Sequence, residues 1–527
     1  MEVPRQNKPR VSKACDVCHR KKTKCHWRPP SCADCIRLGT RCTFSRYEQD
    51  TSSGGNGVLK NDRPGRQANC QSPALRSPQE GEQLRSSALL VTNNVSVRRL
   101  DILHALEGKD IQFEIQRYFI QVNHYFPLFS RERFNNYLTD SFGPSLDDTS
   151  LSSACISAML ACLYQNQRMS GSGQESSSGD TAAVERLLEH ALSVAKHVIV
   201  GIPTLPGIQL LATIAVNLAG EQSRGGIAAN LLVAAIRMAF SLRLHRLDEA
   251  TDISVAERLE KIRVFWCLYI LDVELAMRNN APAFIQDDDI LVIEPQKISS
   301  DRCGLLASNL DDGKMLNLFA ARQRLARAAS KIWKELHTFR GQHGPQSERT
   351  EAVVRLNSLL ASWKSGWFDY GPATELAQRW PKASLVYLVE LQYSFFLCLL
   401  KANPHVPCDA MEVLQLLRDN VRPTDISPHC LQCARDTLCL ATVLPQGGTT
   451  QGDVVQYTIP AMVWLLAKAA KANSLERQAS DVSVVDTRLD DTEKCIEKGC
   501  NGVLDAAARA CRELCNLVIY SEESNDR

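Results

Sequence analysis

The sequence predicts a mainly α-helical protein, in which a small N-terminal metal cluster is joined by a flexible linker to a large all-helical domain. Three observations support this prediction: six regularly spaced cysteines near the start, a polar stretch after them, and apolar residues at helical spacing over the rest of the chain. A chain of 527 residues with 44% hydrophobic side chains is long enough for more than one domain. We place the three parts at residues 1–45, 46–100 and 101–527.

The N-terminal cysteines repeat one spacing twice, C-x2-C-x6-C, with six residues between the halves. They are Cys15, Cys18, Cys25, Cys32, Cys35 and Cys42. Structural zinc is held tetrahedrally by such thiolates, so two zinc ions that share six sulfurs need two bridges. The repeat assigns the bridges to the first cysteine of each half, Cys15 and Cys32. The sequence thus predicts two Zn²⁺ per chain.

Two other readings of the cysteines are a disulfide-rich exported domain and a zinc module that contacts only protein. The opening residues, Met1 to Arg10, are polar and basic, so they give no support to an oxidising compartment. The basic residues inside the first half favour a polyanionic partner over a protein contact.

Charge is concentrated in the first half of the repeat. It contains Lys21 and Lys22 where the second half has Leu38 and Gly39. Residues 1–50 hold twelve Lys and Arg against five Asp and Glu, or +7, in a chain of formal net charge +2, so the remainder carries −5. A basic lobe on a near-neutral protein indicates nucleic acid, because each cation set against a phosphate releases counterions. A solvated charged face is the alternative for the lysine pair.

The stretch from Lys13 to Cys25, followed by Pro29-Pro30 and Cys32-Ala-Asp-Cys35, resembles the fungal Zn(2)-Cys(6) binuclear cluster transcription factors. The resemblance implies a first helix in the major groove of double-stranded DNA, where Lys21 and Lys22 contact the bases of CGG-type half-sites. The implied phosphate contacts are Arg10, Lys13, Arg20 and Lys24. It further implies a nuclear regulator of RNA polymerase II genes in primary or secondary metabolism.

Residues 46–98 are rich in Ser, Gly, Asn, Gln and Pro and read as a flexible linker. In many members of this family a heptad coiled coil here pairs two subunits. Leu84 and Val91 are seven residues apart, but Asn93, Asn94 and Arg98 interrupt the apolar seam. A homodimer formed through the helical domain and a monomer on DNA therefore both stay open.

Beyond residue 101 the apolar pattern predicts helices. Glu257–Arg278 is apolar on every side over its middle, which predicts a central helix, and Ile227–Leu247 is amphipathic. The apolar face expected for Ile227–Leu247 comprises Leu231, Ala235, Met238 and Leu242. The polar stretches 171–179 and 474–492 are predicted to be loops. No run of eighteen apolar residues occurs, so no membrane span is expected.

Three helical segments, Tyr118–Phe129, Ala239–His245 and Arg263–Asp272, resemble the fungal-specific transcription factor domain, or middle homology region. The resemblance implies an all-helical regulatory domain, and Leu385–Leu400 fits the same architecture. It leaves a small-molecule effector open. The alternative is a DNA-targeted enzyme or metabolite-binding sensor whose main activity lies in the helical domain. We expect no enzyme, since the phosphate-loop, zincin and nucleophile-elbow motifs are not found.

Single residues in the helical part have structural interpretations. Asp272 interrupts an apolar helix and needs a partner such as an arginine or a helix end, because an unpaired buried carboxylate is costly. Asp287–Asp289 lacks the ligand spacing of a calcium loop and predicts no metal site. Seven cysteines are predicted to be small buried hydrophobes: Cys155, Cys162, Cys267, Cys398, Cys495, Cys511 and Cys515.

Overall fold

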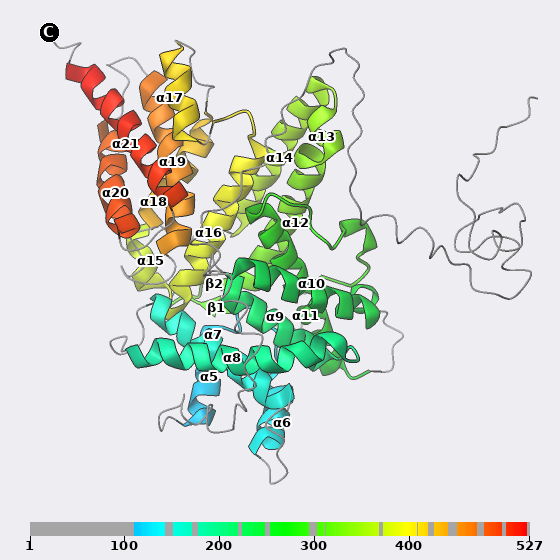
Figure 1. The fold of residues 1–527 in the computed structure, drawn as a ribbon. Coiled ribbons are helices and arrows are strands. Elements are labelled where there is room, and N and C mark those ends of the chain that lie inside the picture. Colours follow the sequence, from blue (N-terminus) through cyan, green and yellow to red (C-terminus); the bar gives the residue numbers. More distant parts are fainter. Residues whose placement is uncertain are drawn as a thin grey trace, which may run out of the picture. The chain divides into compact units, whose positions relative to one another are not determined.

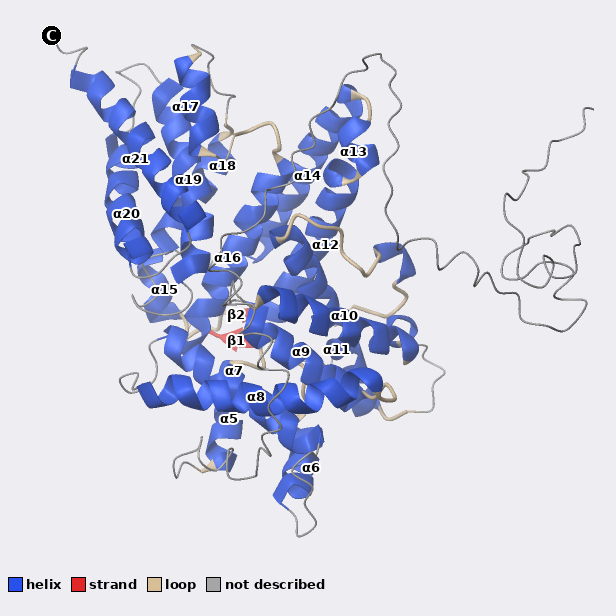
Figure 2. Ribbon diagram, viewed as in Figure 1, coloured by secondary structure: helices blue, strands red, loops and turns tan. Residues whose placement is uncertain are grey.

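A computed structural model describes residues 110–142, 151–170, 178–219, 224–247, 253–294, 303–310, 312–367, 373–407, 409–419, 426–440, 451–471, 479–497 and 502–523. Contacts divide the chain into two units, Met1–Asn93 and Asn94–Arg527, and every described residue belongs to the second. The described part is helical except for loops and one short two-stranded ribbon, as Figures 1 and 2 show. The mainly α-helical prediction is confirmed.

The first helices form the part of Figure 1 coloured blue to green. They are α5 (Ile111–Gln121), α6 (Arg131–Phe142), α7 (Leu151–Ser170), α8 (Ser178–Val200), α9 (Leu205–Ala219), α10 (Gly225–Ser241) and α11 (Val255–Arg278). Helix α7 packs against α5, α6, α8 and α9, and α9 packs against α10 and α11. Because α7 and α9 are buried over most of their length, they form the core of this group.

The remaining helices run from the green to the red part of Figure 1. They are α12 (Leu318–Ile332), α13 (Phe339–His343), α14 (Gln346–Trp367), α15 (Ala373–Arg379), α16 (Lys382–Ala402), α17 (Ala410–Arg418), α18 (Pro428–Leu440), α19 (Gln451–Lys471), α20 (Ala479–Glu497) and α21 (Gly502–Glu523). Helix α19 contacts α17, α18, α20 and α21, so it is the centre of the C-terminal group.

The predicted central helix is α11, as expected from its all-round apolar middle. It begins at an N-cap residue, Ser254, whose hydroxyl accepts a hydrogen bond from the Glu257 amide at 3.2 Å. Its residues from Val264 to Val273 are buried in an unbroken run. Helices α9, α10, α12 and α16 pack around it. Central position and apolar composition therefore agree.

Helix α16 connects the two groups of helices. It contacts α7, α11 and α12 on one side and α18 and α19 on the other. It is long and apolar enough to cross a membrane, but 78% of its 18-residue apolar window is buried inside the protein. That degree of burial is typical of a core helix in a folded domain.

The predicted helix Ile227–Leu247 ends earlier than expected. Helix α10 stops at Ser241, Arg243 takes a left-handed φ of 55°, and a short 3-10 turn follows at Leu244–Arg246. Leu231, Ala235 and Met238 are buried as predicted, but Leu242 is 38% exposed. The periodic pattern was wrong there because the chain leaves the helix just before Leu242.

The predicted loop 474–492 is also wrong over most of its length, because α20 covers Ala479–Glu497. Val482, Val485 and Leu489 are buried on one face of it, next to α19 and α21. Two of the polar residues that suggested a loop flank this stripe, where Arg512 of α21 pairs with Asp486 at 2.5 Å and Asp490 at 2.6 Å. Of the other predicted loop, 171–179, the last two residues begin α8 and the rest lie outside the described residues.

One element is not helical. The strands β1 (Leu305–Ala307) and β2 (Met315–Asn317) pair antiparallel, with Leu306 opposite Leu316. Gly304 precedes them with φ of +88°, and a Cβ there would lie 2.6 Å from Phe319 Cβ. Only glycine fits this entry to the ribbon.

Candidate functional site

The zinc and DNA residues predicted from the sequence lie outside the described residues. These are Cys15, Cys18, Cys25, Cys32, Cys35, Cys42, Arg10, Lys13, Arg20, Lys21, Lys22 and Lys24. Their fit to zinc rests on the donor set, since six thiols in two equal triplets supply the soft ligands that zinc prefers. The candidate site that the described structure does contain is a cavity in the helical domain.

The cavity has a volume of about 100 Å³ and lies where the turn after α5 meets α7, α9, α11, α12 and α16. Its apolar lining includes Val122, Phe126, Val216 and Leu271. Its polar lining consists of Gln165, Asn166, Asn217, Glu274, Arg278, Arg322 and Glu390. A mixed lining of this kind is typical of sites for small molecules.

A buried ion pair forms one wall of the cavity. Arg322 of α12 donates from Nε and Nη2 to the two Glu274 carboxylate oxygens of α11, at 3.1 and 2.7 Å. Its Nη1 donates to the Tyr125 carbonyl at 3.0 Å, and the guanidinium lies 3.7 Å from the centre of the Tyr125 ring. Burial lowers the pKa of Arg322, but the negative charge of Glu274 outweighs burial and leaves the pKa raised. The charge is therefore fixed in place by a bidentate partner.

Stacked aromatic rings lie beside this pair. The Tyr125 and Tyr387 rings stack with centroids 4.2 Å apart, and His124 meets Tyr387 edge-on at 5.6 Å. His124 Nδ1 lies 3.1 Å from the Ile120 carbonyl, which can only accept, so Nδ1 carries the proton. Burial lowers the pKa of His124 to about 4, so the ring is neutral at physiological pH.

Two buried asparagines complete the polar lining. Asn217 of α9 donates from Nδ2 to the Thr213 carbonyl at 2.9 Å and to the Ala158 carbonyl at 3.2 Å. Asn166 of α7 donates from Nδ2 to the Ala383 carbonyl at 3.2 Å. The side-chain oxygens of both asparagines are buried and have no hydrogen-bond partner within the described part of the chain. Neither oxygen is accessible to a water molecule, so the two acceptors are closed off from the cavity itself.

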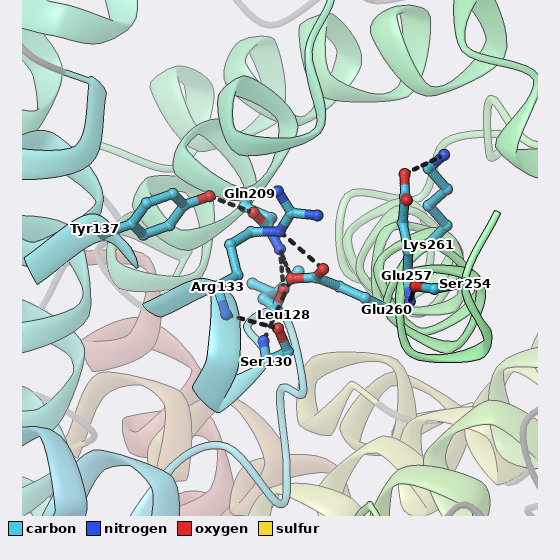
Figure 3. Close-up of polar contacts among 9 residues, drawn as sticks. All are labelled: Leu128, Ser130, Arg133, Tyr137, Gln209, Ser254, Glu257, Glu260 and Lys261. Carbon is cyan, nitrogen blue, oxygen red and sulfur yellow. Dashed lines mark hydrogen bonds and ion pairs between the residues drawn. The ribbon is translucent and has the colours of Figure 1, made fainter. Parts of the chain in front are cut away.

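A second polar cluster, drawn in Figure 3, is fully used by the fold. The Glu260 carboxylate accepts from Gln209 Nε2 at 2.9 Å and from Arg133 Nε at 2.8 Å. Gln209 Nε2 also donates to the Leu128 carbonyl, and its Oε1 accepts from the Tyr137 hydroxyl at 3.0 Å. Because its donors and acceptors satisfy one another, this cluster ties α6, α9 and α11 together and offers nothing to a ligand.

Asp272 has a partner, but of a different kind from the arginine considered above. Its Oδ2 accepts from the Ile285 backbone amide at 2.7 Å, so it holds the segment that follows α11. Burial raises the pKa of Asp272 to about 6, against the lowering effect of the backbone amides of Ile285 and Phe284. This is a structural contact, as the sequence suggested.

The aspartates at 287–289 form a short 3-10 turn, and the first two are engaged by neighbours. Asp287 accepts from the Tyr269 hydroxyl at 2.6 Å and the Ser330 hydroxyl at 2.8 Å, and Asp288 pairs with Lys334 at 2.8 Å. Within the residues that the structure describes, no group of three His, Cys, Asp or Glu side chains is arranged to hold a metal ion.

Six of the seven cysteines predicted to be buried are buried, which confirms their reading as small hydrophobes; the side chain of Cys495 lies outside the described residues. The six are Cys155, Cys162, Cys267, Cys398, Cys511 and Cys515. Burial raises the pKa of Cys162 to about 12, so its thiol is protonated and unreactive.

The sequence did not single out the cavity residues, although it contained a signal for some of them. Arg322 comes four residues after Leu318 and three before Leu325, on the apolar stripe of α12, and so had to be a buried charge. Asn217 interrupts the apolar α9 in the same way. Helical periodicity could therefore have identified these residues as buried polar positions. It could not have predicted that their helices bring them close together.

Comparisons with known proteins agree with the motifs. The fungal specific transcription factor domain matches residues 115–363, and the fungal Zn(2)-Cys(6) binuclear cluster domain matches residues 13–51. The latter domain binds two zinc ions in its family. No solved structure gives a significant match.

Several curated proteins are similar to the chain. An ABC-transporter-regulating transcription factor of Aspergillus fumigatus is 25% identical over 300 residues, which cover 54% of this chain and 33% of that protein. The Fusaridione A cluster transcription factor fsdR of Fusarium heterosporum is 23% identical over 307 residues, or 56% of each chain. Transcription factor macR of Penicillium terrestre is 42% identical over 55 residues, 10% of this chain and 6% of that protein.

The chain aligns with only a third of the length of the Aspergillus relative. The alignment with macR is short and of higher identity, and the alignments with the Aspergillus and Fusarium relatives extend over some 300 residues at lower identity. The chain therefore belongs to the fungal Zn(2)-Cys(6) transcription factors that carry a fungal specific transcription factor domain.

Proposed function

We propose that this protein is a nuclear, zinc-dependent regulator that binds double-stranded DNA at CGG-type half-sites and controls transcription by RNA polymerase II. The observation that carries the proposal is the doubled C-x2-C-x6-C spacing with a basic run inside its first half, all within the residues that match the binuclear cluster domain. The regulated genes belong to primary or secondary metabolism, a proposal supported by the Fusaridione A cluster relative.

The six cysteines are proposed to hold two zinc ions, with Cys15 and Cys32 as the bridging ligands. When bound, the metal supplies the rigidity that a segment this short cannot obtain from a hydrophobic core. The part that reads DNA is proposed to be residues 1–45, followed by a linker at 46–100 and the regulatory domain at 101–527.

Lys21 and Lys22 are the proposed base-reading residues. A lysine ammonium held at the end of a short helix can donate to the O6 and N7 acceptors of guanine in the major groove. Arg10, Lys13, Arg20 and Lys24 are the proposed phosphate contacts, which fix orientation and carry no sequence information of their own. Base and phosphate contacts should therefore respond differently to mutation.

The test is selection of binding sites from random DNA with the zinc-loaded full chain, repeated after chelation. We expect CGG triplets that are lost on chelation. Lys22→Ala should cost about 1–3 kcal/mol and relax the preference at one position, whereas Arg10→Ala should weaken binding to all sequences and reduce its salt dependence. Failure to enrich any sequence in the presence of zinc would refute the proposal.

The selected sites also decide how many chains bind. Two triplets at a fixed spacing would indicate a homodimer, formed through the helical domain, while a single triplet would indicate a monomer. We propose no catalytic activity for the helical domain, since the matched domains and relatives are those of transcription regulators.

A further inference from the structure

We propose that a pocket between the C-terminal ends of α11 and α12 binds an organic cation, a protonated amine with an apolar or aromatic body, whose ammonium group donates to the Asp287 carboxylate. We call it the Trp333 pocket; it shares no lining residue with the cavity described above. The inference concerns the helical domain alone and does not depend on which DNA the cluster binds. It is carried by the lining of the pocket, the partners of Asp287 and a π-helix in one wall.

The Trp333 pocket has an apolar floor and a polar rim, and its volume is about 100 Å³. The floor is formed by buried side chains of α11, of α12 and of the segment after α11: Val273, Met277, Ile285 and Ala329. At the rim, Pro282, Gln286 and Lys334 are exposed, so the pocket opens to solvent and sets no upper limit on the length of a ligand. The floor suits an apolar body, and the polar lining decides which charge goes with it.

Asp287 is a lining carboxylate that has no ion-pair partner within the described part of the chain. Its Oδ1 accepts from the Tyr269 hydroxyl at 2.6 Å and its Oδ2 from the Ser330 hydroxyl at 2.8 Å. Burial raises the pKa of Tyr269 above its ordinary value, so this donor is neutral. The ammonium of Lys334 pairs with Asp288 instead, at 2.8 Å. Asp287 is therefore held by two neutral groups.

Two hydroxyls compensate this carboxylate only in part. A carboxylate offers about four acceptor sites, of which two are used here. Asp287 is half-buried, so water replaces the missing partners incompletely. Ser330 also lines the pocket, which puts its hydrogen bond with Asp287 at the pocket wall. An ammonium group entering there supplies a donor and the opposite charge together, and charge-assisted hydrogen bonds are the stronger kind.

The charge around the pocket disfavours an anion. Asp287, Asp288 and Asp289 occupy one 3-10 turn, and Lys334 is the one cation among the described lining residues. Three carboxylates against one ammonium leave an excess of negative charge, which repels anions and attracts cations.

A π-helix forms one wall of the pocket. The chain passes from α12 into this element at Trp333–His337, and Trp333, Lys334 and the capping residue Thr338 all line the pocket. The π-helix is rare and occurs frequently at functional sites. His337 stacks on the half-buried Trp333 ring with centroids 5.4 Å apart, which holds the indole in place. Tryptophan is the best aromatic partner for a cation, so this wall favours the same class of ligand as Asp287.

Benzylamine and benzyl alcohol form a matched pair of probes, because both carry one benzyl group and only the amine is charged at neutral pH. We expect benzylamine to raise the melting temperature of the full chain saturably, and to bind about tenfold or more tightly than benzyl alcohol. Equal affinities for the two, or no saturable binding of benzylamine, would overturn the proposal.

Two aspartates of the same turn supply a matched pair of variants. Asp287→Asn removes the proposed partner of the ammonium group and should weaken benzylamine binding about tenfold or more. Asp289→Asn removes the same charge from an exposed residue outside the lining, and salt screening should keep its effect below about twofold. Equal losses in both variants would mean that the charge of the turn attracts the amine without a site. Undiminished binding in folded Asp287→Asn would refute the assignment.

Filling the pocket tests the location independently of Asp287, and replaces the first variant if Asp287→Asn does not unfold cooperatively. Ala276→Leu adds bulk to a half-buried part of the lining and should abolish benzylamine binding. Ala361→Leu, at an exposed position of α14, should leave binding unchanged. Benzylamine binding that survives in folded Ala276→Leu would place the ligand elsewhere and overturn the proposal.

Discussion

Arg322 is 2% exposed, and its donors point to partners on two other segments of the chain. Such a pair adds little net stability over a well-packed apolar pair, but removing one member leaves a buried charge alone. The energetic consequence is therefore asymmetric, and it can be measured against a solvent-exposed pair of the same chemistry.

We expect Arg322→Met to lower the free energy of unfolding by about 3–5 kcal/mol, because Glu274 loses its bidentate partner. Lys334→Met breaks the exposed pair with Asp288 and should cost at most about 0.5 kcal/mol. Urea unfolding of the two variants checks this. A similar cost for both would mean that the Arg322 pair is as weak as a surface contact.

Asp272 and His124 give opposite pH dependences over the same range. The pKa of Asp272 is raised from 3.8 to about 6, so the folded state binds more protons there and stability falls as pH rises from about 4 to 6. The pKa of His124 is lowered from 6.5 to about 4, so the unfolded state binds more protons and stability is lost as pH falls from 6.5 to 4. Each shift corresponds to about 3 kcal/mol.

Asp272→Asn should therefore gain stability relative to the unmodified protein as pH rises from 4 to 7, by about 3 kcal/mol, because only the unmodified protein must ionise a buried carboxyl. His124→Gln should lose about the same amount over that range. Urea titrations at pH 4, 5, 6 and 7 test both. Parallel stability profiles for variant and unmodified protein would contradict the shifted pKa values.

The sequence predicts the interaction partner of a single residue only when that partner is near in the chain. That Asp272 is a structural residue with a partner followed from the cost of burying a carboxylate. The identity of the partner did not, because Ile285 reaches it only after the chain turns back beyond α11. The unpaired side-chain oxygens of Asn166 and Asn217 could not be predicted for the same reason, because the residues around them come from separate helices.

At the scale of elements, local signals worked where they were continuous. The apolar run of α11 predicted its central place, and the predicted span, Glu257–Arg278, begins two residues after the observed start at Val255. The polar composition of α20 led to a wrong prediction of a loop. Among the described side chains of this helix, only a narrow stripe is buried, formed by Val482, Val485 and Leu489. Three apolar residues give only a weak helical signal in the sequence. The segment is helical because its buried stripe packs against α19 and α21, which stabilise it.

The role of that stripe can be measured. Leu489→Ala should lower the free energy of unfolding by about 2–5 kcal/mol, because it leaves a cavity against the neighbouring helices. Ser483→Ala, at an exposed position of the same helix, should change it by no more than about 0.5 kcal/mol. Chemical denaturation followed by circular dichroism is the measurement. If neither substitution changed the free energy of unfolding, the loop predicted from composition would be the better description of this segment.

At the scale of the whole molecule, the chain divides into a unit that ends at Asn93 and a unit that begins at Asn94. The described residues of the second unit contain no cluster of metal ligands, and its core is made of apolar side chains. From the sequence we predicted parts at residues 1–45, 46–100 and 101–527, because cysteine spacing dominates the first and helical periodicity the last; these boundaries stay a prediction. The family membership of the chain followed from the same two patterns.

Metal removal should separate the two units functionally. Treatment with EDTA should abolish DNA binding, since zinc ligation supplies about 10–16 kcal/mol to small structural sites. The main thermal transition of the helical unit should stay at the same temperature. Calorimetry and a DNA shift assay on one sample test this. A drop of the main transition on chelation would show that metal also stabilises the helical unit.

The contacts of α16 bear on how the protein can be divided for study. The match to the fungal specific transcription factor domain ends at residue 363, before α16 begins at Lys382. Yet α16 supplies Tyr387 and Glu390 to the cavity, and its Phe395 stacks on Trp363 at 5.2 Å. A fragment cut at the edge of sequence similarity would lose one wall of the cavity and uncover apolar surface on α11 and α12. The smallest autonomous piece must extend at least through Ala402, where α16 ends.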